Sequence, residues 1–325
     1  MKMSIMVPFY NEEGMIQLTH STIVSVLDEM VNRRNQTLDD KIELEFVYVN
    51  DGSRDNTFQL MKEIASTDER VKYVSFSRNF GKDAATIAGL RYATGDIVVM
   101  MDGDLQHPPQ VVEQMLDAYF EGYDVVSARR TREGEDAKET FFAKWFYRLS
   151  NSMMDVKLTD GVSEFRLFSR KAVNAVLALP EYNRFAKGLF SWIGFKEKIV
   201  EYPNQVREVG VSKFGVRRNI NYAIQGILSF NDKPLRICIK TGLFCVTIAV
   251  LYLIWMFISW LINPNTLVSG YFTTLFAIVL FGGVQLISIG VLGEYIGKIY
   301  YEVKRRPHYL VDESNIESIG KDQVQ

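Results

Sequence analysis

The sequence has few of the residues that build disulfide frameworks or zinc sites. Its 325 residues include only two cysteines, Cys238 and Cys245, which share one apolar stretch, and only three histidines, which are scattered. This pattern excludes a disulfide framework and a zinc site. The net charge of −2 leaves no overall basic field, which argues against nucleic acid as a partner.

Charged residues are missing from the whole stretch Thr241–Gly293. Its first part, Thr241–Ile262, is long enough to cross a bilayer as a helix. Asn263–Asn265 interrupts it, and a second apolar run, Tyr271–Leu292, is long enough to cross back. A buried hairpin in a soluble core is the alternative, but two such runs in tandem are rare in soluble folds. The sequence therefore predicts two transmembrane helices.

Basic residues flank this predicted hairpin on both sides, and the connecting loop has no charge. The flanking residues are Lys233, Arg236 and Lys240 before it and Lys298, Lys304, Arg305 and Arg306 after it. Because basic flanks stay on the cytoplasmic side, we expect a multi-pass protein of the cell membrane whose N-terminal region and both termini are cytoplasmic. The apolar run Met3–Val7 is too short for a signal peptide.

Apolar strands alternate with helices from the start of the chain to about residue 128. The expected strands are Ser4–Pro8, Ile42–Val49, Val71–Ser75, Ile97–Met101 and Asp124–Ala128, with a later one at Glu197–Tyr202. The expected helices end near Arg33, Ser66, Ala93 and Glu121. This alternation predicts an α/β fold with a doubly wound, mostly parallel sheet.

Two aspartates follow the fourth expected strand. In extended backbone, Asp102 and Asp104 would point to the same side, with Gln106 next in the same register. Oxygen ligands suit Mg²⁺ or Mn²⁺, and these metals keep positions open for phosphate oxygens. The alternative is an ordinary polar turn after a buried strand.

Polar side chains follow the other expected strands as well. These clusters are Asn11–Glu13, Asp51–Ser53 and Arg78–Asn79. Ligands of such sheets bind beyond the carboxyl ends of the strands, so four polar strand ends on one edge indicate a binding site. Asp51 suits hydrogen bonds to a base or ribose, and its alternative role is to cap the helix that follows it.

Four segments later in the chain have less distinct patterns, and three of them allow two structural interpretations each. Arg129–Asp136 is either a solvated loop or a lid over an anionic acceptor. Phe141–Arg148 is either a helix in the membrane interface or an ordinary core helix. Arg207–Gly215 can wrap a pyrophosphate with backbone N–H groups, although a flexible loop would look the same. Arg217–Phe230 is expected to be an amphipathic helix leading to the membrane.

Six motifs are spread over nearly the whole chain. They are Val7–Glu13, Asn50–Ser53, Asn79–Lys82, Asp102–Pro109, Phe165–Leu167 and Ser212–Phe214. Together with the two apolar runs, they resemble the family-2 inverting glycosyltransferases, and more narrowly the polyprenyl-phosphate glycosyltransferases that include dolichol-phosphate mannose synthase and bactoprenol glucosyltransferase. This resemblance implies a nucleotide-diphospho-sugar transferase fold. It divides the chain into a cytosolic catalytic domain (1–210), a pyrophosphate loop with a juxtamembrane helix (211–236), two transmembrane helices (237–297) and a cytosolic tail (298–325).

The resemblance implies a role for each matched residue. The nucleotide would be held by Pro8, Tyr10, Glu12 and Asp51, and the metal and diphosphate by Asp102, Asp104 and Gln106. Donor or acceptor phosphates would meet Arg129, Arg184, Arg207 and Lys213, and further substrate contacts would come from Lys82, Arg130 and Ser212. Asp104 and Arg129 would also belong to the catalytic group. Many relatives carry aspartate directly before Phe-Arg-Leu, whereas this chain carries Glu164 there and Asp160 earlier, so either acid can take the base-like position.

The implied acceptor is a lipid monophosphate, whose oxygen is largely anionic at neutral pH and needs no strong base. We expect transfer of glucose or N-acetylglucosamine from a UDP-sugar to undecaprenyl phosphate for cell-envelope glycan modification, with Mg²⁺ or Mn²⁺ as cofactor. The close alternative is a GDP-mannose-dependent polyprenyl- or dolichyl-phosphate mannosyltransferase. The alternative from another class is a non-catalytic membrane scaffold that binds lipid or nucleotide. A homo-oligomer is also expected.

Overall fold

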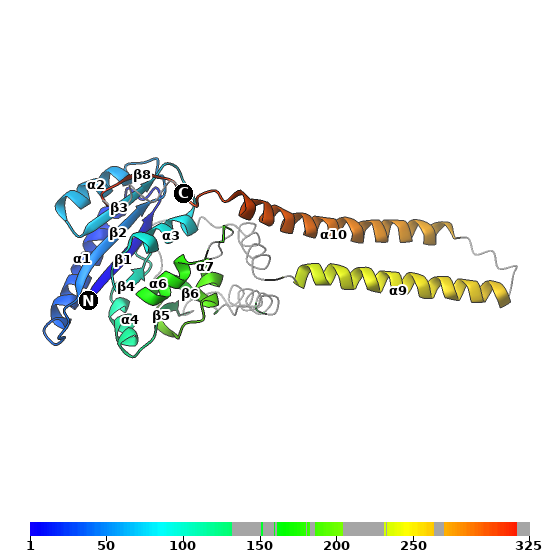
Figure 1. Ribbon diagram of the computed structural model, residues 1–325, viewed down its shortest axis with the longest axis horizontal. Helices are drawn as coiled ribbons and strands as arrows, with labels where there is room; N and C mark the ends of the chain where they lie inside the picture. Colours follow the sequence, from blue (N-terminus) through cyan, green and yellow to red (C-terminus); the bar gives the residue numbers. More distant parts are fainter. Residues whose placement is uncertain are drawn as a thin grey trace.

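The protein consists of an α/β domain and two long apolar helices that project from it (Figure 1). The computed structural model describes residues 1–131, 151, 159, 161–179, 181–182, 186–203, 231, 233–262 and 270–316. The strands are β1 (Lys2–Phe9), β2 (Glu43–Asn50), β3 (Val71–Phe76), β4 (Ile97–Met100), β5 (Val125–Arg130), β6 (Val162–Ser169), β7 (Glu197–Tyr202) and β8 (Val311–Ser314). The helices are α1 (Ile16–Arg34), α2 (Thr57–Thr67), α3 (Lys82–Tyr92), α4 (Val111–Phe120), α6 (Arg170–Leu177), α7 (Ala186–Trp192), α9 (Lys233–Ile262) and α10 (Tyr271–Lys304).

One mixed sheet carries all eight of these strands in the order β7-β5-β6-β4-β1-β2-β3-β8. Strands β1 to β4 are parallel to their neighbours among themselves, and β5 is parallel to β7. Strand β6 is antiparallel to β4 and β5, and β8 is antiparallel to β3. The prediction of a doubly wound, mostly parallel sheet is therefore confirmed, whereas β6 and β8 were not expected from the sequence.

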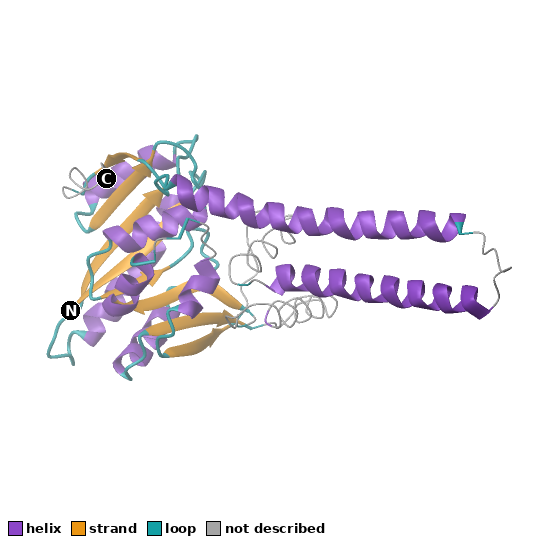
Figure 2. Ribbon diagram, turned by 45° about the vertical axis from the view of Figure 1, so that its right-hand side comes forward, coloured by secondary structure: helices purple, strands orange, loops and turns teal. Residues whose placement is uncertain are grey.

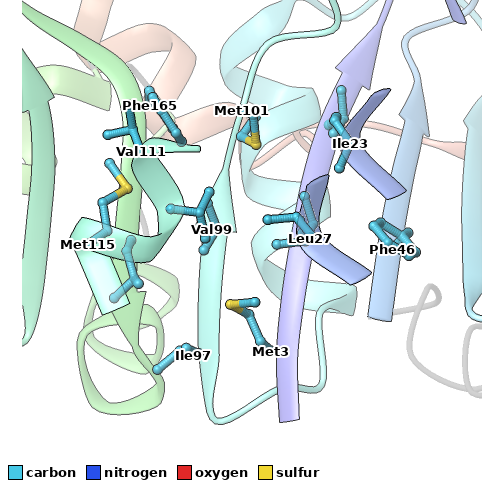
Figure 3. Close-up of a cluster of buried hydrophobic side chains, with 14 of the residues drawn as sticks. Met3, Ile23, Leu27, Phe46, Ile97, Val99, Met101, Val111, Met115 and Phe165 are labelled. Carbon is cyan, nitrogen blue, oxygen red and sulfur yellow. The ribbon is translucent and has the colours of Figure 1, made fainter. Parts of the chain in front are cut away.

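The two faces of the sheet are covered by different helices, because alternate residues of each strand point to opposite faces. Ile5 and Val99 pack with α1, α2 and α4 in one cluster, part of which Figure 3 shows. Met6 and Val98 pack in a second cluster with α3, α6 and α7. Strands buried on both faces read as continuous apolar runs, which is why the sequence located them well.

The order of the strands reverses at β1, which lies between β2 and β4. The backbone N–H of Met101 donates to the carbonyl of Met6 on the β4 side, and that of Asp51 donates to the carbonyl of Phe9 on the β2 side. Successive residues of β1 direct their N–H and C=O groups alternately toward β4 and β2. The nitrogen of Pro8 therefore faces the β4 side, at a point beyond Met100 where β4 has already ended. A proline is tolerated in this inner strand for that reason. Ligands of such sheets bind at the point of reversal.

Helices α9 and α10 lie side by side and extend away from the sheet (Figures 1 and 2). Lys233–Ile262 and Thr273–Lys304 are each long and apolar enough to cross a membrane, and their most apolar stretches are not buried within the described part of the protein. The two long apolar helices that composition predicted are thus present.

The chain returns to the sheet after α10. Arg305 ends the helix in the left-handed conformation, with φ of 48°. The ring of Tyr309 then stacks on Phe76, the last residue of β3, with 4.7 Å between ring centroids. Beyond it, β8 pairs with β3. The end of α10 therefore lies near the carboxyl edge of the sheet.

A second contact joins α10 to the α/β domain. The backbone N–H of Tyr182 donates to the carboxylate of Glu302, with N–O distances of 2.9 and 3.0 Å. The ring of Tyr182 stacks on Tyr301 at 5.9 Å and on His308 at 5.5 Å. The end of the hairpin nearest the α/β domain is consequently held by contacts with two separate parts of that domain.

Candidate active site

The loops that follow β1 and β2 are tied together by hydrogen bonds. The backbone N–H of Asn11 donates to the hydroxyl of Ser53 at 3.0 Å, and that of Arg54 donates to Oδ1 of Asn11 at 2.9 Å. The backbone N–H of Glu12 donates to Oγ1 of Thr57 at 2.8 Å. These contacts fix the backbone around Glu12, while Tyr10 keeps an exposed ring.

Asp51, at the end of β2, holds the start of α3. Its carboxylate accepts hydrogen bonds from the backbone N–H groups of Phe80 at 2.7 Å and Gly81 at 3.0 Å, and from Nδ2 of Asn79 at 3.0 Å. Burial raises the pKa of Asp51, and the two backbone N–H groups oppose that rise. The predicted alternative role, capping the next helix along the chain, was wrong, because the helix start that Asp51 supports is that of α3.

Gly52 brings the loops after β2 and β3 into backbone contact. It has φ of +61°, and a Cβ atom at this position would lie 2.1 Å from the carbonyl carbon of Arg78 and 2.5 Å from the nitrogen of Asn79. Only glycine permits this approach together with this backbone conformation. The contact keeps the β3–α3 loop within reach of Asp51.

His107 orients the backbone of Asp102. Its Nδ1 accepts a hydrogen bond from the backbone N–H of Asp102 at 3.1 Å, and its ring stacks on Phe165 at 5.0 Å. Burial lowers the pKa of His107, so the ring is neutral near pH 7 and carries its hydrogen on Nε2. His107 was not among the predicted site residues; its position three residues after Asp104 was the only signal that could have indicated it.

The backbone turns between the two aspartates. Strand β4 ends at Met100, and Leu105 has a positive φ of 55°. The backbone N–H of Gln106 donates to Oδ1 of Asp104 at 3.2 Å, which closes the turn. The extended backbone expected here is therefore absent, since the chain turns at Gly103 and Asp104, and the orientation of the two carboxylates toward one cation stays a prediction.

Lys82 joins the aspartate motif to the acid before Phe-Arg-Leu. Its Nζ lies 2.6 Å from Oδ1 of Asp102 and 2.7 Å from Oε2 of Glu164. Partial burial alone would lower the pKa of Lys82, but the charges of Asp102 and Glu164 more than offset it and raise that pKa above its ordinary value. The structure thus brings together three residues that the sequence predicted as separate parts of a site.

The arginines predicted in a lid belong to a strand. Arg129 and Arg130 are the last two residues of β5, so the proposal that they start a loop was wrong. Nε of Arg129 lies 3.0 Å from Oε1 of Glu201 on β7, and the two side chains form an ion pair. Both arginines still stand at the carboxyl end of a strand parallel to β4, on the same edge as Asp102.

Several predicted residues lie outside the described part of the chain. They are Asp160, Arg184, Arg207, Ser212 and Lys213, together with most of the predicted lid and the helices expected at Phe141–Arg148 and Arg217–Phe230. Their predicted roles remain predictions, and so does the choice between Asp160 and Glu164.

The carboxylates of the site fit a divalent cation bound together with a diphosphate. Within residues 1–131, 161–179 and the other described ranges, no group of three or more His, Cys, Asp or Glu side chains is placed to hold a metal ion. Asp102 and Glu164, however, already share one cation, the ammonium group of Lys82. Mg²⁺ needs only one or two carboxylates when phosphates supply other ligands, so this oxygen set suits such an ion.

The chain belongs to glycosyl transferase family 2, whose model matches residues 4–177. This range covers β1 to α6, including Asp51, Lys82, Asp102 and Glu164, and the protein is a glycosyltransferase by this membership. A second model, described as the GtrB C-terminal hairpin, matches residues 233–299, which comprise α9 and most of α10.

Relatives match nearly the whole chain. The putative glycosyltransferase CsbB of Bacillus subtilis (strain 168) is 46% identical over 96% of this chain and 92% of its own length. The SfII prophage-derived bactoprenol glucosyl transferase of Shigella flexneri is 42% identical over 97% of this chain and 99% of its own length. Among solved structures, the mannosyltransferase PcManGT from Pyrobaculum calidifontis in complex with GDP-Man and Mn²⁺ is 18% identical, with a TM-score of 0.47 over 69% of this chain and 62% of its own.

Proposed function

We propose that this glycosyltransferase is anchored in the membrane and transfers glucose or N-acetylglucosamine from a UDP-sugar to undecaprenyl phosphate, with inversion at the anomeric carbon. The product would serve cell-envelope glycan modification. The acceptor is proposed from the bactoprenol glucosyl transferase that is similar to this chain over nearly its full length. The basic flanks of the hairpin support a cytoplasmic catalytic domain and cytoplasmic termini.

One structural observation supports a lipid acceptor above all: the apolar hairpin meets the α/β domain at the edge that carries the site. Tyr309, shortly after α10, stacks on the last residue of β3, and the backbone N–H of Ser77 donates to the carbonyl of Leu310 at 3.0 Å. Asp51 and Asp102 follow β2 and β4 on that same edge. A polyprenyl chain in the membrane and a sugar donor in the cytosol can therefore approach one site.

The residues on this edge divide the work between two anionic substrates. Pro8, Tyr10, Glu12 and Asp51 would hold the nucleotide. Asp102, Asp104 and Gln106 would hold Mg²⁺ or Mn²⁺ with the diphosphate, and the bound ion would act as a Lewis acid toward the departing nucleoside diphosphate. The lipid phosphate is already largely ionised at pH 7.

The main task left to the protein is therefore to hold the two anions in line, which cationic side chains achieve by offsetting their repulsion. Lys82 at the junction of the two acids, and Arg129 and Arg130 at the end of β5, are the described cations suited to this. Glu164 would orient the acceptor, and its role as a base would be less demanding than in transfer to a sugar hydroxyl.

A donor-by-donor transfer assay tests this proposal. Purified full-length protein in detergent is mixed with undecaprenyl or dolichyl phosphate, Mn²⁺, and labelled UDP-glucose, UDP-N-acetylglucosamine or GDP-mannose. The expected result is a labelled, lipid-extractable product from one of the UDP-sugars and undecaprenyl phosphate.

The other outcomes separate the alternatives. A product from GDP-mannose alone would identify the mannosyltransferase. Binding of UDP without a lipid product from any donor would contradict the transfer of sugar to a lipid phosphate and favour the non-catalytic scaffold.

A further inference from the structure

Two acids lie close to each other at the centre of the site. Strands β4 and β6 are antiparallel neighbours, and the last register pair joins Met100 to Arg166. Asp102 follows the end of β4 by two residues, and Glu164 lies on β6 two residues before Arg166. Both carboxylates contact the same ammonium group, that of Lys82, at 2.6 and 2.7 Å. Two like charges this close repel each other, and a counter-ion between them offsets the repulsion.

Lys82 supplies that counter-ion from a position that is unfavourable for its own helix. It is the first residue of α3, and a cation at a helix N-terminus is repelled by the helix dipole. The helix start is held instead by Asp51 through the backbone of Phe80 and Gly81. The stabilisation of the Lys82 ammonium therefore comes from Asp102 and Glu164, at 2.6 and 2.7 Å.

We propose that the ammonium group of Lys82 is the counter-ion of the Asp102 and Glu164 carboxylates until the nucleotide-sugar donor binds. The ammonium group competes with free divalent cations for Asp102, so the protein without nucleotide binds them weakly. When a nucleoside diphosphate binds, its phosphates attract the ammonium group away from Asp102 and add ligands for the metal ion. Metal and nucleotide then strengthen each other's binding, by the same factor in both directions.

Side-chain exposure supports a movable ammonium group. The Lys82 side chain is 47% exposed, whereas those of Asp102 and Glu164 are 27% and 18% exposed. The stem of a lysine is flexible and its charge is compact, so Lys82 can turn toward a diphosphate while the two carboxylates stay in place. This inference rests on the proposed metal site and adds to it the order in which the site is filled.

The test measures Mn²⁺ binding to the full-length protein in detergent, with no sugar donor or lipid present, by following free Mn²⁺ with electron paramagnetic resonance. Lys82→Met removes the ammonium group and keeps most of the stem. We expect it to bind Mn²⁺ about tenfold or more tightly than the unchanged protein in the absence of nucleotide, because a positive charge next to the ligand is gone. Adding UDP should tighten Mn²⁺ binding strongly in the unchanged protein and much less in this variant.

Two control variants separate charge from other effects. Lys82→Arg keeps a cation between the acids and should bind Mn²⁺ as weakly as the unchanged protein when nucleotide is absent. Lys171→Met removes the same charge from a surface ion pair, in which Nζ of Lys171 lies 3.2 Å from Oδ2 of Asp124. It should leave Mn²⁺ binding unaltered, which controls for the change in net charge.

Each remaining outcome contradicts the proposal. Equal or weaker Mn²⁺ binding by Lys82→Met than by the unchanged protein would remove the competition on which the proposal depends. Tight binding by Lys82→Arg would mean that charge is not the cause. If no variant binds Mn²⁺ even with UDP, both this inference and the metal site are wrong, whereas the sugar-transfer assay still decides the proposed function separately.

Discussion

Replacing Gly52 with alanine should destabilise the α/β domain more than any ordinary glycine replacement. The left-handed φ of +61° alone is unfavourable for alanine by about 1 kcal/mol. The added Cβ atom would also lie 2.1 Å from the carbonyl carbon of Arg78 and 2.5 Å from the nitrogen of Asn79. Neither backbone atom can retreat without pulling the loop away from Asp51, and overpacking of this kind costs about 1–3 kcal/mol. We therefore expect a loss of about 3 kcal/mol in the free energy of unfolding.

Gly122→Ala is the matched control. Gly122 also has a left-handed φ, +90°, but nothing lies within 4 Å of the Cβ position. This variant should lose only about 1 kcal/mol, the contribution of backbone conformation. The difference between the two variants measures the close contact between the β2–α2 and β3–α3 loops.

Pulse proteolysis across a urea series measures both values, because it reports opening of the α/β domain even if the apolar hairpin stays folded. UDP binding at low temperature provides a second measurement. Gly52→Ala should weaken it, since Asp51 and its loop shift, and Gly122→Ala should not. Equal stability of the two variants, or unchanged UDP binding by Gly52→Ala, would refute this account of the loop contact.

Three further predictions follow from the site and its supports. Asp104→Asn should slow sugar transfer by about a hundredfold or more, with poor rescue by excess Mn²⁺. Glu164→Gln should slow it less, because the proposed acceptor, a lipid phosphate, is already ionised; an equal loss in both would give Glu164 a proton or an orienting role. Burial would raise the pKa of Glu45, but hydrogen bonds from its neighbours lower that pKa below the ordinary 4.5, so ionised Glu45 stabilises the fold above that pH. Glu45→Gln should therefore lower the free energy of unfolding by about 2 kcal/mol at pH 7. The difference in stability between the variant and the unchanged protein should shrink as the pH falls below 4.5. A difference that stays constant down to pH 3 would contradict the stabilising role of the ionised Glu45 carboxylate. Tyr182→Ala removes the stack on Tyr301 of α10 and should raise KM for the proposed lipid acceptor without changing UDP binding. An unchanged KM would show that the contact between Tyr182 and α10 does not help to position the acceptor.

The parallel strands were predictable from the sequence because their signal is local. Most residues of β1 to β5 are buried, and the buried stretches consist mainly of apolar residues between polar turns. Strand β6 gave a weaker signal, since Glu164 and Arg166 interrupt its apolar residues. Strand β8 gave none, because Val311–Ser314 is short and polar and is a strand only through its pairing with β3.

The site was predictable in part for the same reason. The rule that ligands bind beyond strand ends located Asp51 and Asp102 on one edge. It could not reveal that Asp51 supports α3, that His107 holds the backbone of Asp102, or that Lys82 lies between two acids. Each of these contacts depends on how distant segments pack. Arg129 was assigned to a loop because charged residues at the end of a strand do not differ in pattern from those of a loop.

The return of the chain to β3 after α10 bears on how the protein is made. Residues 307–316 close the edge of the sheet beside β3 and cover Phe76, yet they are synthesised only after both apolar helices. An uncovered sheet edge invites pairing with other chains. If the hairpin enters a bilayer as proposed, the domain would wait during translation with one edge open, and membrane insertion would become a step in completing the fold of the enzyme.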